Sequence, residues 1–282
     1  SKINYLILYL FQIGLINMSR IIVITSGKGG VGKTTATANL GMALAQLGYQ
    51  VALIDADIGL RNLDLLLGLE NRVIYTAIEV LSGECRLEQA LIKDKRQPGL
   101  VLLPAAQNRN KDSINSDQMQ YLVSLMNQQY DYILVDCPAG IESGFHNAIA
   151  PADEAIVVTT PEIAAVRDAD RVIGLLEANN IKRISLLINR LRPQMVKAND
   201  MMSVADVKEI LAIPLVGVIP EDECVIVSTN RGEPLVLENK LSLPGLAFEH
   251  TACRLDGQDV EFLDLQLYSK GPLKRLRRFF LG

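Results

Sequence analysis

The sequence predicts an α/β fold in which helices flank a doubly wound, mostly parallel sheet. Short apolar runs bounded by turn residues recur along the 282-residue chain, as is typical of strands that are buried on both faces. Segments with helical spacing lie between these runs, and such alternation favours parallel strands joined by crossover helices. Ligands of these folds bind at the carboxyl ends of the strands, so the turns that follow the strands should carry the function.

Seven segments have the pattern of a buried strand, namely residues 20–25, 50–55, 100–104, 132–136, 154–160, 184–189 and 214–219. The clearest helical patterns cover residues 34–47, which Gly48 ends, and residues 162–178, where apolar residues recur at helical spacing. No internal repeat or low-complexity linker divides the chain. We therefore expect one domain rather than two.

The ends of the chain differ from this central domain, which we place at residues 18–250. Residues 1–17 contain an apolar run that is shorter than the ~20 residues of a membrane-spanning helix. Because Met18 directly precedes the first strand, we expect it to be the natural start and residues 1–17 to be an upstream extension. Residues 251–270 have weaker periodicity and are expected to connect the domain to a terminal segment, residues 271–282.

The charge of the chain is unevenly distributed. The net charge is −4, but the last thirteen residues hold five basic residues and no acidic residue. The rest of the chain therefore has 23 basic and 32 acidic residues, a net charge of −9. We expect no general nucleic-acid binding by so acidic a body, because such binding depends on neutralising phosphates. The four cysteines are scattered without a CxxC pair, which indicates reduced thiols rather than a disulfide framework.

A phosphate-binding pattern follows the first strand. Gly27, Gly32, Lys33 and Thr34 fit the P-loop pattern G-x-x-x-x-G-K-[ST], and it lies between a predicted strand and a predicted helix. Backbone N–H groups of such a loop converge on phosphate oxygens, and the helix adds the positive end of its dipole. Lys33 is expected to reach the β- and γ-phosphates and Thr34 to bind Mg²⁺. The sequence thus predicts a P-loop NTPase domain.

Carboxylates follow two further strands. Asp136 ends the apolar run YILVD, which is the Walker-B arrangement of a magnesium-binding aspartate, and Asp55 and Asp57 follow another strand. An aspartate at a strand end can merely cap the next helix. Three of them around one phosphate loop instead predict a site that hydrolyses or senses a nucleoside triphosphate.

The motifs KGGVGKTT, DADIGLRNLD and DCPAGIE together resemble the deviant Walker-A ATPases of the MinD/ParA family, particularly those of cyanobacteria and algal plastids. The resemblance covers residues 18–282 and implies ATP and Mg²⁺ as cofactors. It implies that the second lysine, Lys28, reaches across an ATP-dependent homodimer to the partner's phosphates. A solvated lysine without a catalytic role is the alternative.

Further roles come from the same resemblance. Lys28, Lys33 and Asp57 are the implied catalytic residues, with Asp57 positioning the attacking water. Thr34, Asp55 and Asp136 are the implied metal ligands, while Asn62 and Glu142 fall in dimer-facing segments. The implied nucleotide contacts are Lys28, Gly29, Gly30, Val31, Gly32, Lys33, Thr34, Thr35, Asn189, Pro220 and Asp222, of which Asn189 and the turn from Pro220 to Asp222 would line the adenine. Asp64 receives no role.

The terminal segment predicts a short amphipathic helix. Leu273, Leu276, Phe279 and Phe280 fall on one side at helical spacing, opposite Lys274, Arg275, Arg277 and Arg278. This helix either docks on the domain or lies in an anionic membrane surface. Because one such tail binds weakly, two tails on an ATP-bound dimer would make membrane binding conditional on ATP.

The resemblance implies a peripheral membrane ATPase that places the division septum with a division inhibitor and a factor that stimulates hydrolysis. It implies a plastid location, on the inner envelope, or alternatively the inner membrane of a bacterium. A DNA-partitioning ATPase of the same family is an alternative that the acidic body disfavours. A flagellar-number regulator would differ only in partners, and an iron–sulfur electron carrier would require paired cysteines.

Overall fold

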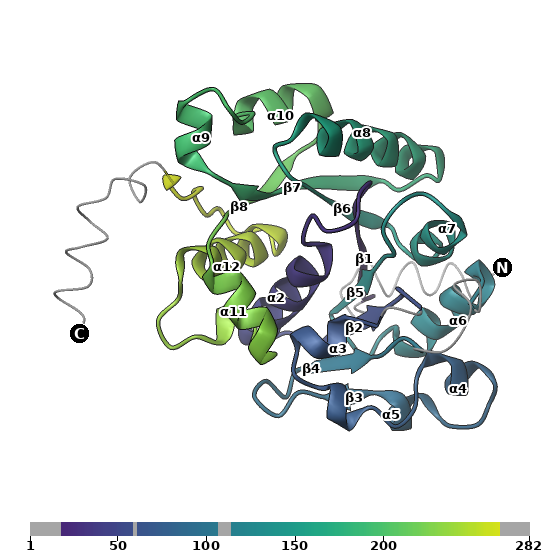
Figure 1. The fold of residues 1–282 in the computed structure, drawn as a ribbon. Coiled ribbons are helices and arrows are strands. Elements are labelled where there is room, and N and C mark those ends of the chain that lie inside the picture. The colour runs from purple at the N-terminus through teal and green to yellow at the C-terminus, as the bar shows by residue number, and fades with distance from the viewer. Residues whose placement is uncertain (1–17, 59–60, 107–113, 266–282) are drawn as a thin grey trace.

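The computed structural model describes residues 18–58, 61–106 and 114–265. Across these residues one eight-stranded sheet runs through the molecule in the order β3-β4-β2-β5-β1-β6-β7-β8 (Figure 1). Its strands are β1 Arg20–Thr25, β2 Val51–Asp55, β3 Ile92–Lys93, β4 Leu100–Leu103, β5 Tyr132–Asp136, β6 Glu154–Thr159, β7 Arg183–Leu191 and β8 Leu215–Pro220. All neighbouring pairs are parallel except β3 with β4, which is antiparallel.

The predicted fold class is confirmed. Each of the seven predicted strands is present within one or two residues at either end, and the predicted helices at 34–47 and 162–178 correspond to α2 (Lys33–Gln46) and α8 (Ile163–Ala178). The short edge strand β3 was not predicted. Two residues are too few to show the alternation by which a strand is recognised in a sequence.

Helices cover both faces of the sheet (Figure 1). The other helices are α3 Leu63–Leu66, α4 Ala77–Leu81, α5 Leu87–Ala90, α6 Ser116–Met126, α7 Ser143–Ile149, α9 Pro193–Lys197, α10 Val204–Leu211, α11 Cys224–Arg231 and α12 Leu243–Leu255, with short 3-10 turns at η1 Glu70–Arg72 and η2 Leu235–Leu237. The core against α2 and α12 contains Ile22 and Ile24 of β1. The intervening Val23 belongs to the opposite core, which α6, α7 and α8 cover.

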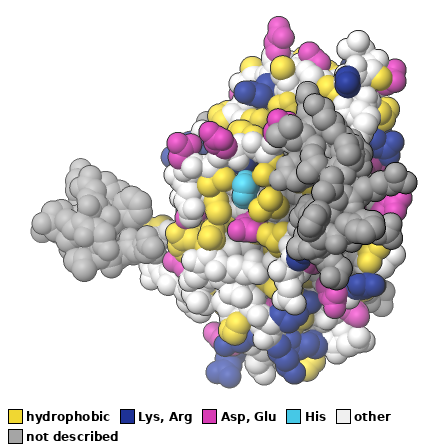
Figure 2. All heavy atoms as spheres, turned by 90° about the vertical axis from the view of Figure 1, so that its left-hand side faces the viewer, with side chains coloured by type: hydrophobic (Ala, Val, Ile, Leu, Met, Phe, Trp, Pro, Cys, Tyr) yellow, Lys and Arg dark blue, Asp and Glu magenta, His cyan; other side chains and the backbone are white. Residues whose placement is uncertain are grey.

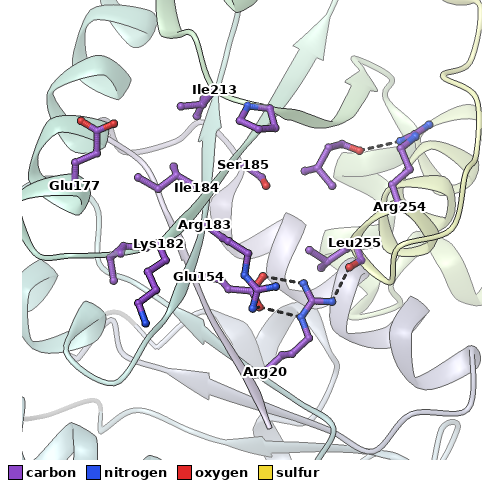
Figure 3. A pocket seen from close by; sticks show the side chains of 13 residues that line it. Arg20, Glu154, Glu177, Lys182, Arg183, Ile184, Ser185, Ile213, Arg254 and Leu255 are labelled. Carbon is purple, nitrogen blue, oxygen red and sulfur yellow. Dashed lines mark hydrogen bonds and ion pairs between the residues drawn. The ribbon is translucent and has the colours of Figure 1, made fainter. Parts of the chain in front are cut away.

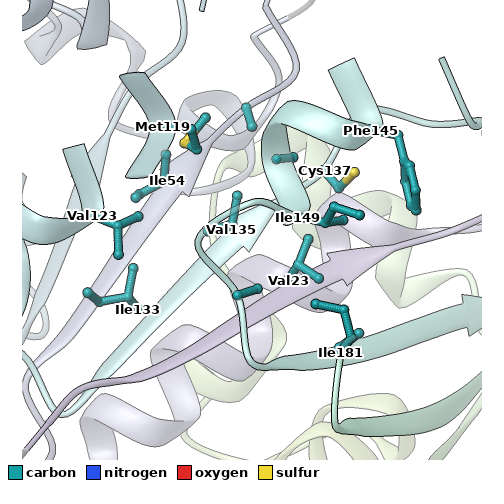
Figure 4. Packing of buried hydrophobic residues seen from close by; sticks show 14 of the residues in the cluster. Val23, Ile54, Met119, Val123, Ile133, Val135, Cys137, Phe145, Ile149 and Ile181 are labelled. Atoms are coloured by element: carbon teal, nitrogen blue, oxygen red, sulfur yellow. The ribbon is translucent and has the colours of Figure 1, made fainter. Parts of the chain in front are cut away.

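That opposite core is drawn in Figure 4, where Val23, Ile54, Ile133 and Val135 of the strands form one cluster with Met119 and Val123 of α6 and with Phe145 and Ile149 of α7. Because β1 is buried on both faces, its side chains are apolar at every position from Ile21 to Ile24. Such two-sided burial holds the loop after β1 on a rigid base.

The loop after β1 lies where the winding of the sheet reverses. β1 pairs with β5 on one side and β6 on the other, so the chain runs outward in both directions from this strand. Crevices at the carboxyl ends of strands at such a switch point are the usual ligand sites of open α/β sheets. The fold therefore places the predicted P-loop where a nucleotide would bind.

The predicted domain boundary at residue 250 falls inside α12, whose buried side chains continue to Leu255. Residues 271–282, and with them the predicted amphipathic helix, lie outside the described residues. Within residues 18–265, gaps excepted, no helix has the length and apolarity to cross a bilayer.

On the face shown in Figure 2, Lys and Arg side chains gather toward the lower edge, while hydrophobic and acidic side chains are interspersed above them.

Candidate nucleotide site

The loop between β1 and α2 has the backbone of an anion-binding loop. Gly30 and Gly32 have φ angles of 79° and 95°, in the left-handed region that glycine enters without a steric penalty. Gly32 directly precedes α2, and no side chain caps this helix. The first N–H groups of α2 are therefore available to phosphate oxygens, together with the positive end of the helix dipole.

One helix, α8, and one strand, β7, hold this loop in place. A Cβ on Gly27 would collide with the backbone carbonyl of Asp168 in α8, so only glycine fits there. Asn189, near the end of β7, donates from Nδ2 to the Val31 carbonyl oxygen at 2.8 Å, and its amide also fills the space where a Gly32 side chain would lie. The loop is therefore packed against α8 on one side and β7 on the other.

Lys33 is the buried cation of the site. Its Nζ lies 3.1 Å from Asp136 Oδ1, and the Thr37 hydroxyl donates to the same oxygen at 3.0 Å. Burial alone would lower the pKa of Lys33, but the Asp136 carboxylate more than compensates, so this pKa lies above its usual value. Lys33 therefore stays protonated and positively charged at the base of the loop.

Asp55 and Asp136 lie side by side at the ends of β2 and β5, where they are register partners. Burial, with the charge of Asp136, raises the pKa of Asp55 to about 7. The Asp55 oxygens accept backbone N–H groups of Asp57 at 3.0 Å and Leu63 at 3.2 Å. Two buried carboxylates so close together create a negative site that a cation would stabilise.

Mg²⁺ fits this pair of carboxylates. Oδ2 of Asp136 is buried and has no hydrogen-bond partner among the residues the structure describes. A buried carboxylate oxygen without a partner is costly unless a ligand satisfies it. Mg²⁺ is usually bound through one or two carboxylates, with waters and substrate phosphates completing its shell. Thr34, which follows Lys33 at the start of α2 and is half-buried, could supply the hydroxyl.

Asp57 and Glu142 lie on the two turns that follow β2 and β5. Both contribute to the lining of one small cavity of about 30 Å³ between these turns. The Gly140 N–H donates to the Ser26 carbonyl oxygen at 3.3 Å, which ties the second turn to the phosphate loop. Asp57 is thus close to the site, while Glu142 is exposed on its rim.

The residues predicted to face a second copy, Lys28, Asn62 and Glu142, are exposed. Lys28, Gly29 and Gly30 form the outer part of the loop, and Asn62 is exposed directly before α3.

Thr35 is half-buried, and its carbonyl oxygen accepts from Asn39 Nδ2 at 2.9 Å. Asp64, which received no role, is fully buried, with Arg61 Nε 2.8 Å from its carboxylate.

The predicted adenine contacts lie on adjacent strand ends. Pro220 ends β8 and pairs with Leu191 of β7, two residues beyond Asn189. Asp222 follows in the turn, and its Oδ1 accepts the N–H of Cys224 at 3.0 Å, at the start of α11. The structure brings Asn189 and Asp222 to the same edge of the sheet, while their contact with a base remains a prediction.

Thr37 is a site residue that sequence reasoning missed. It lies one helical turn after Lys33, so both residues face Asp136 from the same side of α2. That spacing is the signal that could have identified it.

A larger cavity of about 480 Å³ lies elsewhere, around Arg20, Glu154 and Arg183 (Figure 3). Arg20, which lines this cavity, already forms an ion pair with Glu154 at 2.7 Å. None of the predicted site residues lines the cavity.

The fold and this site define the chain as a P-loop nucleotide-binding protein with a second lysine in the loop. The model of the CobQ/CobB/MinD/ParA nucleotide-binding domain matches residues 22–235. A putative septum site-determining protein MinD of Guillardia theta is 87% identical over 94% of this chain and 98% of its own length. The septum site-determining protein MinD of Synechocystis is 66% identical over 94% of this chain and 100% of its own. The chain therefore belongs to the MinD/ParA family of P-loop ATPases, in its septum site-determining MinD branch.

Solved structures agree with this assignment. The MinC:MinD cell division complex of Aquifex aeolicus matches with a TM-score of 0.80 at 50% identity, over 86% of this chain and 98% of that one. The Pyrococcus horikoshii septum site-determining protein MinD, complexed with Mg-ADP, matches with a TM-score of 0.78 at 33% identity, over 85% and 96%. The resemblance to the MinD/ParA family inferred from the motifs is thus confirmed.

Proposed function

We propose that this chain is an ATPase that dimerises when it binds ATP, attaches to a membrane through residues 271–282, and helps to position a division septum. The observation that carries the proposal is the buried trio of Lys33, Asp55 and Asp136 directly below a phosphate loop. The similarity to septum site-determining proteins along nearly the whole chain supports the cellular role.

Each residue of the site has a separate task in this proposal. The loop N–H groups and Lys33 bind the phosphates, and Lys33 exchanges its contact with Asp136 for the triphosphate. Thr34, Asp55 and Asp136 would hold Mg²⁺, which would supply positive charge against the phosphates. Asp57, on the turn that the Asp55 carboxylate organises, orients the attacking water.

Lys28 makes hydrolysis depend on a second copy. It is exposed on the outer part of the loop, so it can reach phosphates bound to a partner. A cation placed near the leaving phosphates stabilises the charge that develops in a loose phosphoryl-transfer transition state. If this cation comes from the partner, ATP binding, pairing and hydrolysis are coupled.

The tail converts pairing into membrane attachment. Each Lys or Arg near an anionic leaflet contributes roughly 1 kcal/mol, and each partly buried apolar side chain contributes ~1–2 kcal/mol. Ordering a short helix offsets much of this gain, so one tail binds weakly. Two tails on one dimer gain an avidity of up to ~10²–10⁴.

A division inhibitor is the expected partner, together with a factor that stimulates hydrolysis. The Aquifex aeolicus match is a complex of MinC with MinD, which supports an inhibitor of the MinC type. Relatives come from algae such as Guillardia theta and Chlorella vulgaris and from the cyanobacterium Synechocystis. We therefore propose a plastid location on the inner envelope, with a bacterial inner membrane as the alternative.

A role in DNA partitioning is the rival that an experiment must separate. The ParA-family ATPase of Chlorobium tepidum matches at 24% identity with a TM-score of 0.74, a likeness that shows the fold alone. A flagellar-number regulator would share the membrane attachment and differ in its partners.

Co-sedimentation with anionic liposomes tests the proposal. The protein should sediment with liposomes in ATP, remain in solution in ADP, and not bind added linear DNA. A variant without residues 271–282 is the matched control and should still bind and hydrolyse ATP in solution. Equal sedimentation in ADP and ATP, or undiminished sedimentation of the truncated variant, would contradict the proposal, and ATP-dependent retention on DNA would favour the partitioning role.

A further inference from the structure

Two short helices beside the nucleotide site end at the same point. α3 and α11 are followed by Gly68 and Gly232, and both glycines have a φ of 62°, in the left-handed region that ends many helices. A Cβ on Gly68 would lie 2.8 Å from the Gly232 carbonyl oxygen, and a Cβ on Gly232 would lie 2.6 Å from the Gly68 Cα. The two chain reversals therefore pack backbone against backbone.

One arginine binds both helix ends. Arg96 donates from Nη2 to the carbonyl oxygen of Leu67, at the end of α3, at 2.5 Å. It donates from Nη1 to the carbonyl oxygen of Gly232, at the end of α11, at 3.0 Å. The last carbonyl groups of a helix lack intrahelical partners and carry the negative end of its dipole. A single guanidinium therefore binds one terminal carbonyl group of each helix.

Asp94 fixes this arginine to the sheet. The Asp94 side chain is buried, and its two oxygens accept from Arg96 Nε at 3.0 Å and Nη2 at 2.6 Å. Asp94 directly follows β3, and its N–H donates to the Leu100 carbonyl oxygen at 3.0 Å. Burial raises the pKa of Asp94, but the hydrogen bonds from Arg96 outweigh it, so this pKa is lowered and the pair stays charged.

The opposite ends of the two helices meet the nucleotide site from different sides. The first residue of α3, Leu63, donates its N–H to the Asp55 carboxylate at 3.2 Å, on the metal side. The first residue of α11, Cys224, donates its N–H to Asp222 at 3.0 Å, in the turn predicted to line the adenine. Each helix, of four and eight residues, therefore links one side of the nucleotide site to the shared point that Arg96 binds.

We propose that Arg96 is a positioning residue that couples the metal side of the nucleotide site to its adenine side. By holding the carboxyl ends of α3 and α11 together, it makes the positions of Asp55 and Asp222 depend on each other. The inference rests on the proposed nucleotide function and adds to it a path between the two halves of the site. Lys cannot replace Arg96, because an ammonium lacks the planar fork that contacts both carbonyls and a carboxylate.

A double-mutant cycle measures this coupling. The cycle uses two single variants, Asp55→Asn and Asp222→Ala, and the double variant. Each is made in the natural chain and in an Arg96→Lys chain. The Kd of each protein for a fluorescent ADP analogue is measured with Mg²⁺. In the natural chain the two substitutions should be non-additive by about three- to tenfold. In the Arg96→Lys chain their effects should be additive, while the single urea-unfolding transition shows that the chain remains folded.

Arg72→Lys is the matched control. Arg72 donates to the Lys93 carbonyl oxygen at 2.6 Å, beside the same edge strand, and its substitution should leave the non-additivity intact. If Arg96→Lys fails to fold, Asp94→Asn weakens the same anchor and should also abolish the coupling. Additive effects in the natural chain, or unchanged non-additivity in the Arg96 and Asp94 variants, would overturn the inference. Failure of the natural chain to bind Mg-ADP would instead overturn the proposed function.

Discussion

The Lys33 ammonium and the Asp136 carboxylate form a buried ion pair, with Nζ 3.1 Å from Oδ1, between the start of α2 and the end of β5. Both side chains are buried, so each charge depends on the other until a ligand arrives. A triphosphate offers Lys33 new negative charge, while Mg²⁺ offers Asp136 a new positive charge. When Mg-ATP binds, Lys33 can therefore pair with the triphosphate and Asp136 with Mg²⁺, in place of their contact with each other.

Asp136→Asn should destabilise the nucleotide-free protein by about 3 kcal/mol, because it leaves the Lys33 ammonium buried without its counter-charge. ADP should restore part of this loss, since its phosphates replace the missing negative charge. Urea unfolding with and without ADP measures both effects, and ATP hydrolysis should be lost. Equal stability of the variant and the natural chain without nucleotide would show that the pair is not needed for folding.

The pH dependence of magnesium binding should report on Asp55. Its pKa is raised to about 7, and it must be ionised to bind the metal. The Mg²⁺-dependent affinity for ADP should therefore fall about tenfold as the pH is lowered from about 8 to about 6. Titration by fluorescence at several pH values checks this, and Asp55→Asn should lower the affinity and reduce its dependence on pH over this range.

The stability of the nucleotide-free protein should change with pH in the opposite sense. The folded state holds the Asp55 proton more tightly than the unfolded chain, whose Asp pKa is about 3.9. The folded state therefore binds more protons between that value and about 7, and the contribution of Asp55 to the unfolding free energy falls as the pH rises through this window. A difference between the natural chain and Asp55→Asn that does not change over this window would contradict the prediction.

Gly27→Ala should destabilise the protein and displace the phosphate loop, because its Cβ would collide with the Asp168 backbone carbonyl. A cost of roughly 2 kcal/mol is expected for such overpacking, with a parallel loss of nucleotide affinity. Gly174→Ala in α8 is the control. It has nothing within 4 Å of the added Cβ and should stabilise the helix by about 0.5–1 kcal/mol. Urea unfolding of the two variants compares them directly.

Lys28→Ala should leave a folded protein that binds ATP in the monomer but does not dimerise. Stimulated hydrolysis should fall by about 10²-fold or more, as is typical when one transition-state donor is removed. Size-exclusion chromatography with ATP and a turnover assay check the two effects. Lys182→Ala, at an exposed lysine on the loop before β7, is the control and should behave like the natural chain. Normal stimulated turnover of Lys28→Ala would contradict the role in trans.

Much of the site could be predicted from the sequence because its parts are local. The P-loop is a contiguous stretch between a strand and a helix, and Asp55 and Asp136 each end an apolar run. A strand that is buried on both faces leaves a clear pattern of consecutive apolar residues. Carboxyl ends of parallel strands share one edge of the sheet, so the residues that follow these strands are expected to gather there.

The contacts that join distant segments could not be predicted in this way. Asn189 on the Val31 carbonyl and Arg96 between the ends of α3 and α11 join residues far apart in the chain. Their side chains fit no motif, because hydrogen bonds of this kind depend on where the backbone brings two elements together. The edge strand β3 was missed for a similar reason, since its pairing with β4 rather than its own pattern defines it.

The amino-acid sequence by itself thus determined the fold class, the phosphate loop and the strand-end carboxylates, because strand periodicity and the P-loop pattern are properties of short segments. Only the tertiary structure decided which side chains hold that loop, how strongly Asp55 resists ionisation, and how α3 and α11 are joined. These features depend on burial and on distances between segments, and neither is encoded at any single place in the chain.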